Sequence, residues 1–478
     1  MSPSGAPPGK HVALIGFMGA GKTTLGREVA RRIGRIFVDL DRELERRAGQ
    51  TIAELFAHRG EAEFRTLEET AALEALTEQK PSVIALGGGA VASPRTRAAL
   101  REHAVSVLVE VEPDVAWQRA RGGARPLAKD EDEFQALYRD REPLYRGSAD
   151  ATARDADGVV LAAGGVHVGI GALELLGGLV PGTGDVALVA DAHVSGIYGA
   201  AAQLALGGRL VSTHELARGE EAKTASACSR LWEELALDRG GTLVALGGGC
   251  TTDAAGFVAA TYLRGIDWIA VPTTLVGQVD AAIGGKTGIN LPQGKNLVGT
   301  FHWPVRTVVD PALLETLPEA QRREGLAEVV KTGLLAGEHV WELPQPELVR
   351  RCAAYKTALC LRDPFDRGPR AELNLGHTFA HALESGAEYE ITHGEAVALG
   401  LLAALRLSGL PTDPVEEILR PRPVRADRER AWGALRRDKK GRAGRPRLVL
   451  LEAPGRPRLD VELPEASVRA ALDELIVD

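Results

Sequence analysis

The sequence predicts an α/β fold class built from consecutive domains. Over residues 11–163, short apolar runs alternate with amphipathic helical stretches, and a second alternation begins near Gly164. Such alternation is typical of a parallel sheet covered by helices on both faces. The stretch 319–440 is instead rich in Ala, Leu, Glu and Arg with helical periodicity. We therefore predict a disordered lead over 1–10, a parallel-sheet domain over 11–163, a second α/β domain over 164–317 and a helical domain over 318–478.

The predicted strands are short apolar runs. In the first domain they lie within 11–17, 35–41, 83–89 and 105–112, and Thr23–Ile33 is expected to form a helix. In the second domain they lie within 186–192, 242–249 and 268–274. Two of these runs end in LGGG, where a strand leads into a glycine-rich turn.

Composition excludes several classes of function. The chain has 478 residues and a net charge of −8, without a basic stripe, so we expect small-molecule substrates and no nucleic acid. No apolar run reaches the ~18 residues that a membrane span needs. The polar, Pro-rich start lacks the apolar core of a signal peptide, which indicates a cytoplasmic protein. The four cysteines form no CxxC pair, so a disulfide framework is not expected.

Lysine is scarce in this chain. Only 11 of the 57 basic residues are Lys, and seven of these lie between Lys223 and Lys440. Because this chain otherwise uses arginine for its cations, a position that keeps lysine indicates a need for a compact ammonium group, as in an anion site.

The segment Gly16–Thr23 fits the phosphate-binding pattern GxxxxGK[ST], between a predicted strand and a predicted helix. Its backbone N–H groups and the helix N-terminus would hold the phosphates of ATP. Lys22 would reach the β- and γ-phosphates, and Thr23 would ligate Mg²⁺. The expected ATP-binding residues of this loop are Gly19, Ala20, Gly21, Lys22, Thr23 and Thr24.

Further motifs follow in the first domain. They are Asp39 and Asp41 in VDLD, Arg65 in FRTLE, Gly87–Gly89, Arg125 in ARPL and Arg141 in REPLYR. Arginines suit a carboxylate substrate, and a carboxylate suits a hydroxyl nucleophile. Over roughly residues 10–160 this set resembles shikimate kinase.

This resemblance implies roles for these residues. Asp41 would hold and deprotonate a shikimate hydroxyl, and Arg65 and Arg141 would clamp the shikimate carboxylate. The Gly88 backbone would contact the ring, Arg125 would meet ATP and the transferring phosphate from a lid, and Asp39 would support the Mg²⁺ shell. Relative to the family, the segment after Arg146 looks shortened and leaves little room for a closing helix.

The second half lacks GxGxxG but carries other anion signals. Gly247–Asp253 follows a strand and opens a helix, and Pro272–Thr274 follows the next strand. QVD at 278–280, GGKT at 284–287 and GKN at 294–296 come next.

Glu328, His377 and His393 could form a metal site, since two His and one carboxylate are a normal set for an open Zn²⁺ site, but their spacing alone does not establish it. His377 and His381, one helical turn apart, are an alternative ligand pair.

In this order, GGGxxxD, PTT, QVDxxxGGKT, GKN, GLAEVVK, LNxGHTxxH and HGEAV resemble 3-dehydroquinate synthase over nearly all of 164–445. The resemblance implies Zn²⁺ or Co²⁺ on Glu328, His377 and His393. It implies NAD held by Asp191, Glu220, Lys223, Gly249, Asp253, Thr273, Thr274, Lys286, Lys295 and Thr316. It implies substrate held by Arg264, Asp280, Lys286, Lys295, Asn296, Lys331, Lys356, Arg370, Asn374 and His381, with Lys439 or Lys440 completing the anion clamp.

In the implied reaction, a seven-carbon keto acid phosphate is oxidised, loses phosphate, is reduced again and closes its ring by an aldol step. Lys286, Lys331, Asn374 and His381 would be catalytic, and His381 would relay protons. Asp366 stands where the family generally has Glu, and the segment between Lys331 and Lys356 looks short. If the chain assembles, we expect a homodimer through the synthase half.

Two alternatives remain open. One half could be a non-catalytic binding module, which a broken motif would favour; none of the charged catalytic positions is lost. The other alternative is a gluconate-type kinase fused to a metal-dependent polyol dehydrogenase. Arg65 and Arg141 argue weakly against a neutral sugar acid as the phosphate acceptor. The GGKT–GKN–LNxGH set argues strongly against a simple dehydrogenase. A dehydrogenase would accumulate NADH, whereas the synthase would not.

Overall fold

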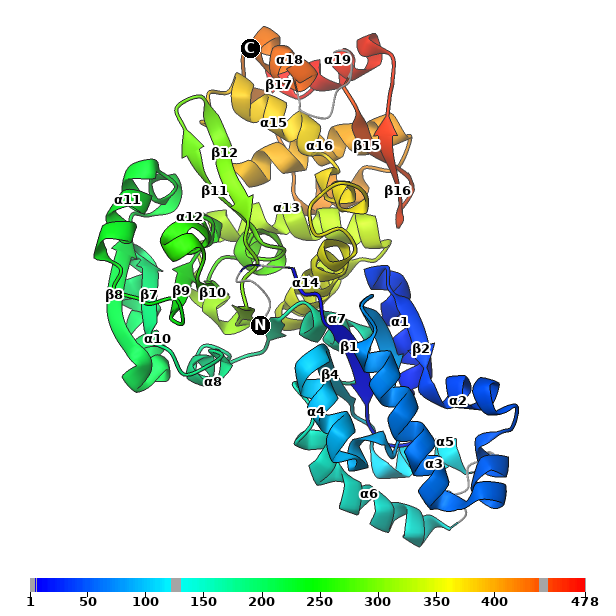
Figure 1. Cartoon of the computed structure of the whole chain (residues 1–478). Coiled ribbons are helices and arrows are strands. Elements are labelled where there is room, and N and C mark those ends of the chain that lie inside the picture. Colours follow the sequence, from blue (N-terminus) through cyan, green and yellow to red (C-terminus); the bar gives the residue numbers. More distant parts are fainter. Residues whose placement is uncertain (1–4, 6, 122–129, 438–445, 478) are drawn as a thin grey trace. The chain divides into compact units, whose positions relative to one another are not determined.

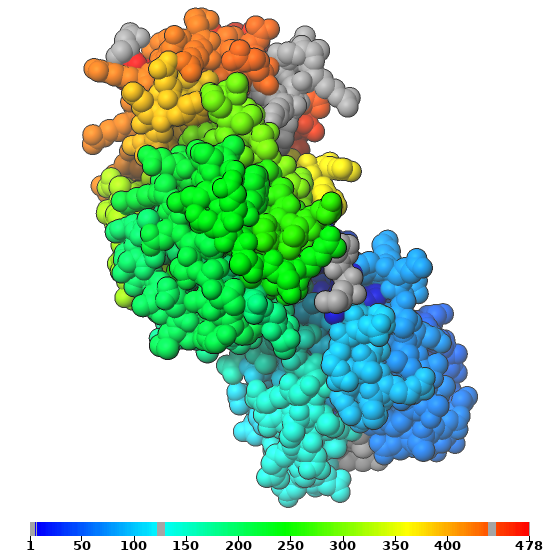
Figure 2. Space-filling view, turned by 60° about the vertical axis from the view of Figure 1, so that its left-hand side comes forward, coloured from blue at the N-terminus to red at the C-terminus, as the bar shows by residue number. Residues whose placement is uncertain are grey.

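The computed structural model describes residue 5 and residues 7–121, 130–437 and 446–477. The chain forms two compact units, one of Pro8–Gly165 and one of Met1–Pro7 with Val166–Asp478. In the space-filling view each unit keeps its own range of colours, blue to cyan for the first and mainly green to red for the second (Figure 2). The predicted lead over 1–10 is too long, because Arg35 donates hydrogen bonds to the carbonyls of Pro8 (2.9 Å) and Lys10 (2.7 Å). Residues 1–4 and 6 lie outside the described residues.

A parallel sheet forms the centre of the unit Pro8–Gly165, with the strand order β2-β3-β1-β4-β5 across the residues described (Figure 1). The four predicted strands and the predicted helix are present. The strands are β1 (His11–Ile15), β2 (Ile36–Asp39), β3 (Ser82–Ala85), β4 (Ala104–Val109) and β5 (Ala151–Ala153). The helices are α1 (Lys22–Ile33), α2 (Leu40–Ala48), α3 (Ile52–Thr77), α4 (Pro94–His103), α5 (Pro113–Ala120), α6 (Glu131–Arg146) and α7 (Ala156–Ala163). All residues of β1 and β3 are buried, as expected for strands covered on both faces.

Helix α7 corrects the expectation that little room remains for a closing helix. Asp155 caps its N-terminus by accepting a hydrogen bond from the Gly158 N–H at 2.8 Å. The helix packs on α1, where the buried Asp157 lies 2.7 Å from the Arg32 guanidinium. The segment ADGVVLAA is apolar nearly all round, so it lacks the amphipathic period by which a surface helix is recognised.

The unit that begins at Val166 also has a parallel sheet, ordered β6-β13-β10-β9-β7-β8 in its described part. The strands are β6 (Val166–Val168), β7 (Val186–Asp191), β8 (Leu210–Leu216), β9 (Thr242–Gly247), β10 (Asp267–Pro272) and β13 (Arg306–Val309). The helices are α8 (Leu176–Leu179), α9 (Ala192–Val194), α10 (Ala200–Leu206), α11 (Ala225–Glu234) and α12 (Gly249–Thr261). Leu243 and Ala245 of β9 share a core with α11 and α12, whereas Val244 and Leu246 share one with α8 and α10. Both faces of this sheet are therefore buried.

An antiparallel hairpin, β11 (Lys286–Leu291) with β12 (Gly294–Phe301), rises from this sheet domain and packs on α12 through β11 (Figure 1). Helices follow, as predicted. They are α13 (Glu319–Ala336), α14 (Gln345–Arg362), α15 (His377–Gly386), α16 (His393–Ser408), α17 (Asp413–Ile418), α18 (Arg428–Arg437) and α19 (Glu465–Asp473), with the short strands β14 (Val424–Arg425), β15 (Leu448–Ala453), β16 (Arg456–Val461) and β17 (Ile476–Val477). None of the helices in the described part of the chain combines the length and apolar character that crossing a bilayer requires.

Candidate active sites

The loop between β1 and α1 forms a phosphate cradle. Gly16, Gly19 and Gly21 have φ values of 136°, 84° and 88°, a region that side chains other than glycine rarely adopt. Lys22 Nζ donates to the carbonyls of Gly16 (2.7 Å) and Phe17 (3.0 Å), so the ammonium lies over the loop. The predicted ATP-binding residues 19–24 occupy this single turn and the start of α1. Arg125 lies outside the described residues.

Two oxygen-bearing side chains adjoin this loop. Thr23 Oγ1 donates to Asp39 Oδ2 at 2.7 Å, because Asp39 ends β2 and caps α2. These residues supply oxygen ligands alone, the donors that Mg²⁺ prefers. The structure thus brings together the two residues predicted for Mg²⁺.

The glycine run after β3 lets charged side chains meet closely. A Cβ on Gly87 would lie 2.3 Å from Glu68 Oε1 and 2.8 Å from Asp41 Oδ1. A Cβ on Gly89 would lie 1.9 Å from Arg65 Nη1. Only glycine fits at these two positions without displacing the side chains. The predicted residues Asp41 and Arg65 therefore both lie against this run.

Arg141 and Tyr145 of α6 both contact this glycine run at Gly88. Arg141 Nη1 donates to the Gly88 carbonyl at 3.2 Å, and the Tyr145 hydroxyl donates to the same oxygen at 2.5 Å. Burial raises the pKa of Tyr145 to about 12, so its hydroxyl keeps its proton. The four predicted shikimate residues are thus neighbours.

Sequence reasoning assigned no role to Tyr145 or to Glu68, whose Oε2 lies 2.6 Å from Arg65 Nη1. Burial raises the pKa of the Glu68 carboxyl. The signal for both was present, since they belong to the FRTLE and REPLYR motifs.

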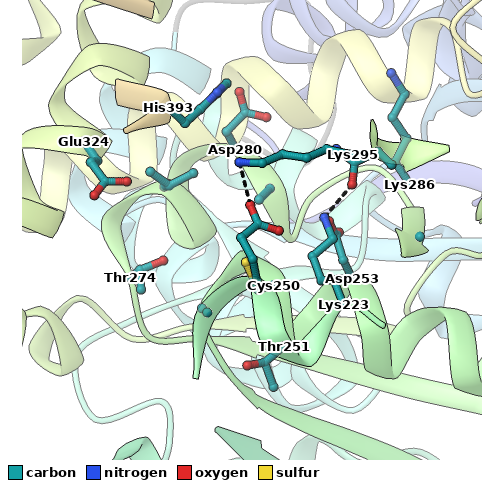
Figure 3. A pocket seen from close by; sticks show the side chains of 18 of the residues that line it. Lys223, Cys250, Thr251, Asp253, Thr274, Asp280, Lys286, Lys295, Glu324 and His393 are labelled. Atoms are coloured by element: carbon teal, nitrogen blue, oxygen red, sulfur yellow. Dashed lines mark hydrogen bonds and ion pairs between the residues drawn. The ribbon is translucent and has the colours of Figure 1, made fainter. Parts of the chain in front are cut away.

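In the second unit, a cavity of about 1410 Å³ lies between the strand ends, the hairpin and the helices (Figure 3). Its wall includes every residue predicted for NAD, which are Asp191, Glu220, Lys223, Gly249, Asp253, Thr273, Thr274, Lys286, Lys295 and Thr316. Five of the ten, namely Asp191, Gly249, Asp253, Thr273 and Thr274, lie at or just after the carboxyl ends of β7, β9 and β10, the edge at which open parallel sheets bind ligands.

An ion pair joins two parts of this wall. Lys223 Nζ lies 2.6 Å from Asp253 Oδ2 on α12. Burial by itself would lower the pKa of Lys223, but the neighbouring Asp253 carboxylate raises it, so the ammonium stays charged. Cys250 lies in the same wall, and burial raises the pKa of its thiol to about 12.

Carboxylates face the other cations of the cavity. Lys286 Nζ lies 2.7 Å from Asp366 Oδ2, so the carboxylate that departs from the family pattern pairs with a predicted catalytic lysine. Asp280 contacts both Lys331 Nζ, at 3.0 Å, and Lys356 Nζ. Burial lowers the pKa of Lys356 to about 8.

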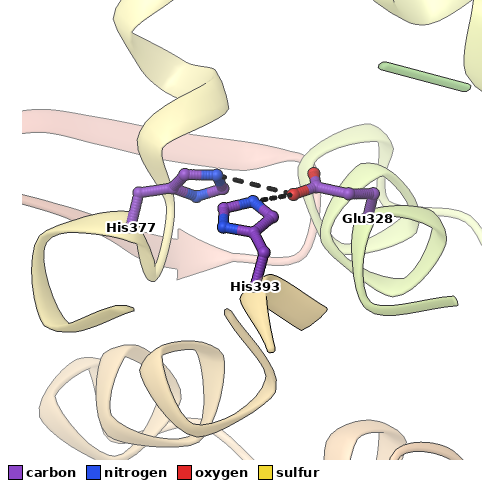
Figure 4. Close-up of side chains that lie close together, drawn as sticks. All are labelled: Glu328, His377 and His393. Atoms are coloured by element: carbon purple, nitrogen blue, oxygen red, sulfur yellow. Dashed lines mark ion pairs between the residues drawn. The ribbon is translucent and has the colours of Figure 1, made fainter. Parts of the chain in front are cut away.

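Three helices bring the metal set together (Figure 4). Glu328 lies in the middle of α13, His377 begins α15 and His393 begins α16. Thr392 and Glu395 form a capping box that fixes the start of α16 at His393.

Glycines allow these helices to approach each other. A Cβ on Gly394 would lie 2.3 Å from the Cα of Glu324 on α13, and one on Gly400 would lie 2.1 Å from the Gly376 carbonyl. Helix α16 therefore touches α13 at one glycine and the start of α15 at the other.

The distances in this cluster fit a metal ion. Glu328 Oε1 lies 3.5 Å from His377 Nε2 and 3.4 Å from His393 Nε2, and the ligand atoms all lie within 4.8 Å of one another. A tetrahedral ion with bonds of about 2.1 Å separates its ligands by about 3.4 Å. Two imidazoles and one buried carboxylate match the donor set of an open Zn²⁺ site.

Neighbouring charges set the protonation of the cluster. Burial lowers the pKa of His377 to about 4, aided by the Lys331 ammonium. For His393 burial acts in the same direction, but hydrogen bonds to Glu328 and Glu384 outweigh it and raise the pKa to about 9. Glu384 Oε1 lies 3.1 Å from His393 Nδ1, a contact that sequence reasoning missed.

Several predicted substrate residues also line the cavity. They are Asp280, Lys286, Lys295, Asn296, Lys356, Arg370 and His381. Lys331 lies behind Asp280 and Glu328 and is 1% exposed. His377 and His381 stand with ring centroids 5.7 Å apart, but His393 and not His381 joins the Glu328 cluster, which argues against the alternative ligand pair.

Two predictions differ from the structure. Arg264 is exposed at a bend with φ 68°, outside the cavity wall. Asn374 donates its amide to the Ala371 carbonyl at 2.9 Å and does not line the cavity either. Lys439 and Lys440 lie outside the described residues.

These features define a P-loop α/β unit followed by an α/β and helical unit that contains a two-histidine, one-carboxylate centre. Family models divide the chain in the same way. Residues 18–162 match shikimate kinase, 213–324 match the N-terminal part of 3-dehydroquinate synthase, and 325–420 match its C-terminal part.

Relatives cover most of the second unit. The chain is 39% identical over 318 residues to 3-dehydroquinate synthase of Latilactobacillus sakei subsp. sakei (strain 23K), across 60% of this chain and 88% of the relative. A solved 2-deoxy-scyllo-inosose synthase in complex with carbaglucose-6-phosphate, NAD⁺ and Co²⁺ is 26% identical, with a TM-score of 0.58 over 65% of this chain and 96% of that one. The same figures hold for 2-epi-5-epi-valiolone synthase from Streptomyces hygroscopicus subsp. jinggangensis 5008 with NAD⁺ and Zn²⁺ bound.

The chain belongs to the 3-dehydroquinate synthase family and carries a shikimate kinase unit ahead of the synthase. It is a bifunctional enzyme of the shikimate pathway.

Proposed function

We propose that the synthase unit converts 3-deoxy-D-arabino-heptulosonate 7-phosphate into 3-dehydroquinate and phosphate, using NAD and a Zn²⁺ or Co²⁺ ion. The observation that carries this proposal is one cavity that joins a strand-end wall, lysine-bearing loops and the metal set. Two solved relatives of similar fold have NAD⁺ and Co²⁺ or Zn²⁺ bound.

The residues of the cavity suit a substrate with a phosphate and a carboxylate. Lys286, Lys356 and Arg370 present cationic groups, and Arg370 is held by a hydrogen bond of 3.0 Å to the Gly284 carbonyl. We assign proton transfer to His381, which is exposed in the cavity wall. When bound, NAD would accept and return a hydride, and the metal on Glu328, His377 and His393 would polarise a substrate oxygen.

We propose further that the kinase unit transfers the γ-phosphate of ATP to the 3-hydroxyl of shikimate. Asp41 lies against Gly87, Arg141 bonds to Gly88 and Arg65 lies against Gly89. The proposal assigns the Asp41 carboxylate to the hydroxyl proton and the two guanidinium groups to the substrate carboxylate. Mg²⁺ with ATP would take Thr23 and Asp39 as its protein oxygens.

Separate assays test the two halves. Phosphate release from the seven-carbon substrate should occur without net NADH accumulation, and ADP should form with shikimate. Lys22→Ala should abolish only the kinase reaction. Net NADH formation would instead indicate a dehydrogenase, and loss of both activities in folded Lys22→Ala protein would refute independent sites. The proposed homodimer through the synthase half is tested by sedimentation of the full chain.

A further inference from the structure

Asn290, at the end of β11, bonds to the cavity wall without lining the cavity. Its backbone N–H donates to the Lys223 carbonyl at 2.8 Å. Its side-chain Nδ2 donates to Glu220 Oε2 at 2.7 Å, and its Oδ1 accepts the Asn296 N–H at 2.9 Å. One side chain thus connects the loop at 220–223 with the far strand of the hairpin.

The partners of Asn290 also bond to other residues of the cavity wall. Glu220 uses its other oxygen, Oε1, to pair with Lys295 Nζ at 2.9 Å. Lys223 Nζ donates to Asn296 Oδ1 at 2.5 Å. Residues predicted for the dinucleotide and residues predicted for the substrate therefore form one network that closes through Asn290.

The backbone at Asn296 depends on this contact. Asn296 has φ 56°, the left-handed region that asparagine tolerates better than most residues. Its N–H is held by Asn290 and its side chain by Lys223, so both ends of the residue are fixed. Loss of the Asn290 side chain would free the turn that presents Lys295 and Asn296.

We propose that Asn290 is a positioning residue that holds the β11–β12 hairpin against the Glu220 loop, so that the dinucleotide and the phosphorylated substrate both bind to one ordered hairpin. The inference rests on the proposed synthase function. Two ligands that need the same ordered hairpin pay its ordering cost once, and the effect is reciprocal.

The test uses the full metal-loaded chain with Asn290→Ala and Asn290→Asp. The Kd for NAD⁺ is measured by titration calorimetry, and KM and kcat are measured by phosphate release. The contact with Glu220 is charge-assisted, so each variant should raise Kd and KM roughly tenfold or more. We expect kcat to change much less, because Asn290 does not touch the reacting atoms.

Reversal of the hydrogen bond gives a sharper control. Asn290→Asp places a carboxylate beside the Glu220 carboxylate, so its defect should ease as the pH is lowered. In the double variant Asn290→Asp with Glu220→Gln, the glutamine amide can donate to the new carboxylate. The double variant should therefore lose less affinity for NAD⁺ than the losses of the two single variants added together. Kinase activity and metal content should stay unchanged throughout.

The possible outcomes distinguish failure of this inference from failure of the proposed function. If the wild type binds NAD⁺ and releases phosphate while both Asn290 variants match it, the inference fails and the proposed function stands. Strictly additive effects in the double variant would likewise overturn the direct contact with Glu220. A wild type that neither binds NAD⁺ nor releases phosphate would refute the proposed function, and this inference with it.

Discussion

Glu384 should control how tightly the synthase unit holds its metal. Its Oε1 lies 3.1 Å from His393 Nδ1, while His393 Nε2 lies 3.4 Å from Glu328 Oε1. A carboxylate that accepts a hydrogen bond from Nδ1–H fixes the orientation of the ring and leaves Nε2 as the metal ligand. The Glu384 side chain is only 7% exposed, and Glu384→Ala removes this buried hydrogen-bond acceptor.

The expected magnitude follows from that single contact. Loss of an outer partner of a ligating histidine costs about 10- to 100-fold in metal affinity, or about 1.4–2.7 kcal/mol. The metal affinity of Glu384→Gln should fall between those of wild type and Glu384→Ala, because its amide oxygen still accepts a hydrogen bond but carries no charge. The matched control is Glu388→Ala, which removes an exposed carboxylate just beyond the end of α15; this carboxylate pairs with Arg430 and not with His393.

The assay is competition between the full chain and a chelator of known Zn²⁺ affinity, with metal content measured by elemental analysis. The visible spectrum of the Co²⁺-loaded chain reports the ligand geometry, and kinase activity reports that the protein is folded. If Glu384→Ala binds Zn²⁺ as tightly as the wild type and Glu388→Ala, the positioning role of Glu384 is refuted.

Three further changes test other parts of the argument. Arg65→Ala should raise the KM for shikimate about 10- to 100-fold, because a charge-assisted contact is lost, and should leave the KM for ATP unchanged in steady-state kinetics; an unchanged KM for shikimate would contradict the assignment. Burial lowers the pKa of Lys356 to about 8, so its ammonium is charged below this pH and is lost above it. The synthase kcat/KM should therefore fall above this pH, and Lys356→Arg should move that fall upward because a guanidinium stays charged; identical pH profiles would refute this. Gly394→Ala places a Cβ 2.3 Å from the Glu324 Cα and should displace α16 from α13 with loss of bound metal, whereas Gly433→Ala, where nothing lies within 4 Å, should retain it; equal metal content in the two variants would contradict the packing argument.

The sequence predicted the sheets better than the contacts between helices. Strands such as β1 and β9 are apolar runs that end in glycine-rich turns, so local pattern alone locates them. Helix α7 has no such pattern, since it is buried nearly all round and is stabilised by an ion pair between Asp157 and the distant Arg32. An interaction of this kind becomes visible only when the two segments are placed side by side.

The same limit applies to the synthase site. Motifs supplied most of the residue types, and spacing alone made His377 and His381 an equally reasonable metal pair. The structure favours His393 because a capping box and close-packed glycines bring the start of α16 to Glu328. Asn290 and Glu384 gave no local signal, because what matters about them is the residue that each one bonds.

The scarcity of lysine gains a physical meaning from the contacts. Each lysine in the described part of 223–440 meets a carboxylate: Lys223 with Asp253, Lys286 with Asp366, Lys295 with Glu220, Lys331 with Asp280 and Glu328, and Lys356 with Asp280. An ammonium has three donors on one small atom, so it can keep a carboxylate partner and still donate to a substrate anion. A guanidinium would commit its planar fork to the carboxylate and leave less room for the ligand. Carboxylates beside these lysines therefore balance the charge of the cavity and leave ammonium donors for the proposed anionic substrate.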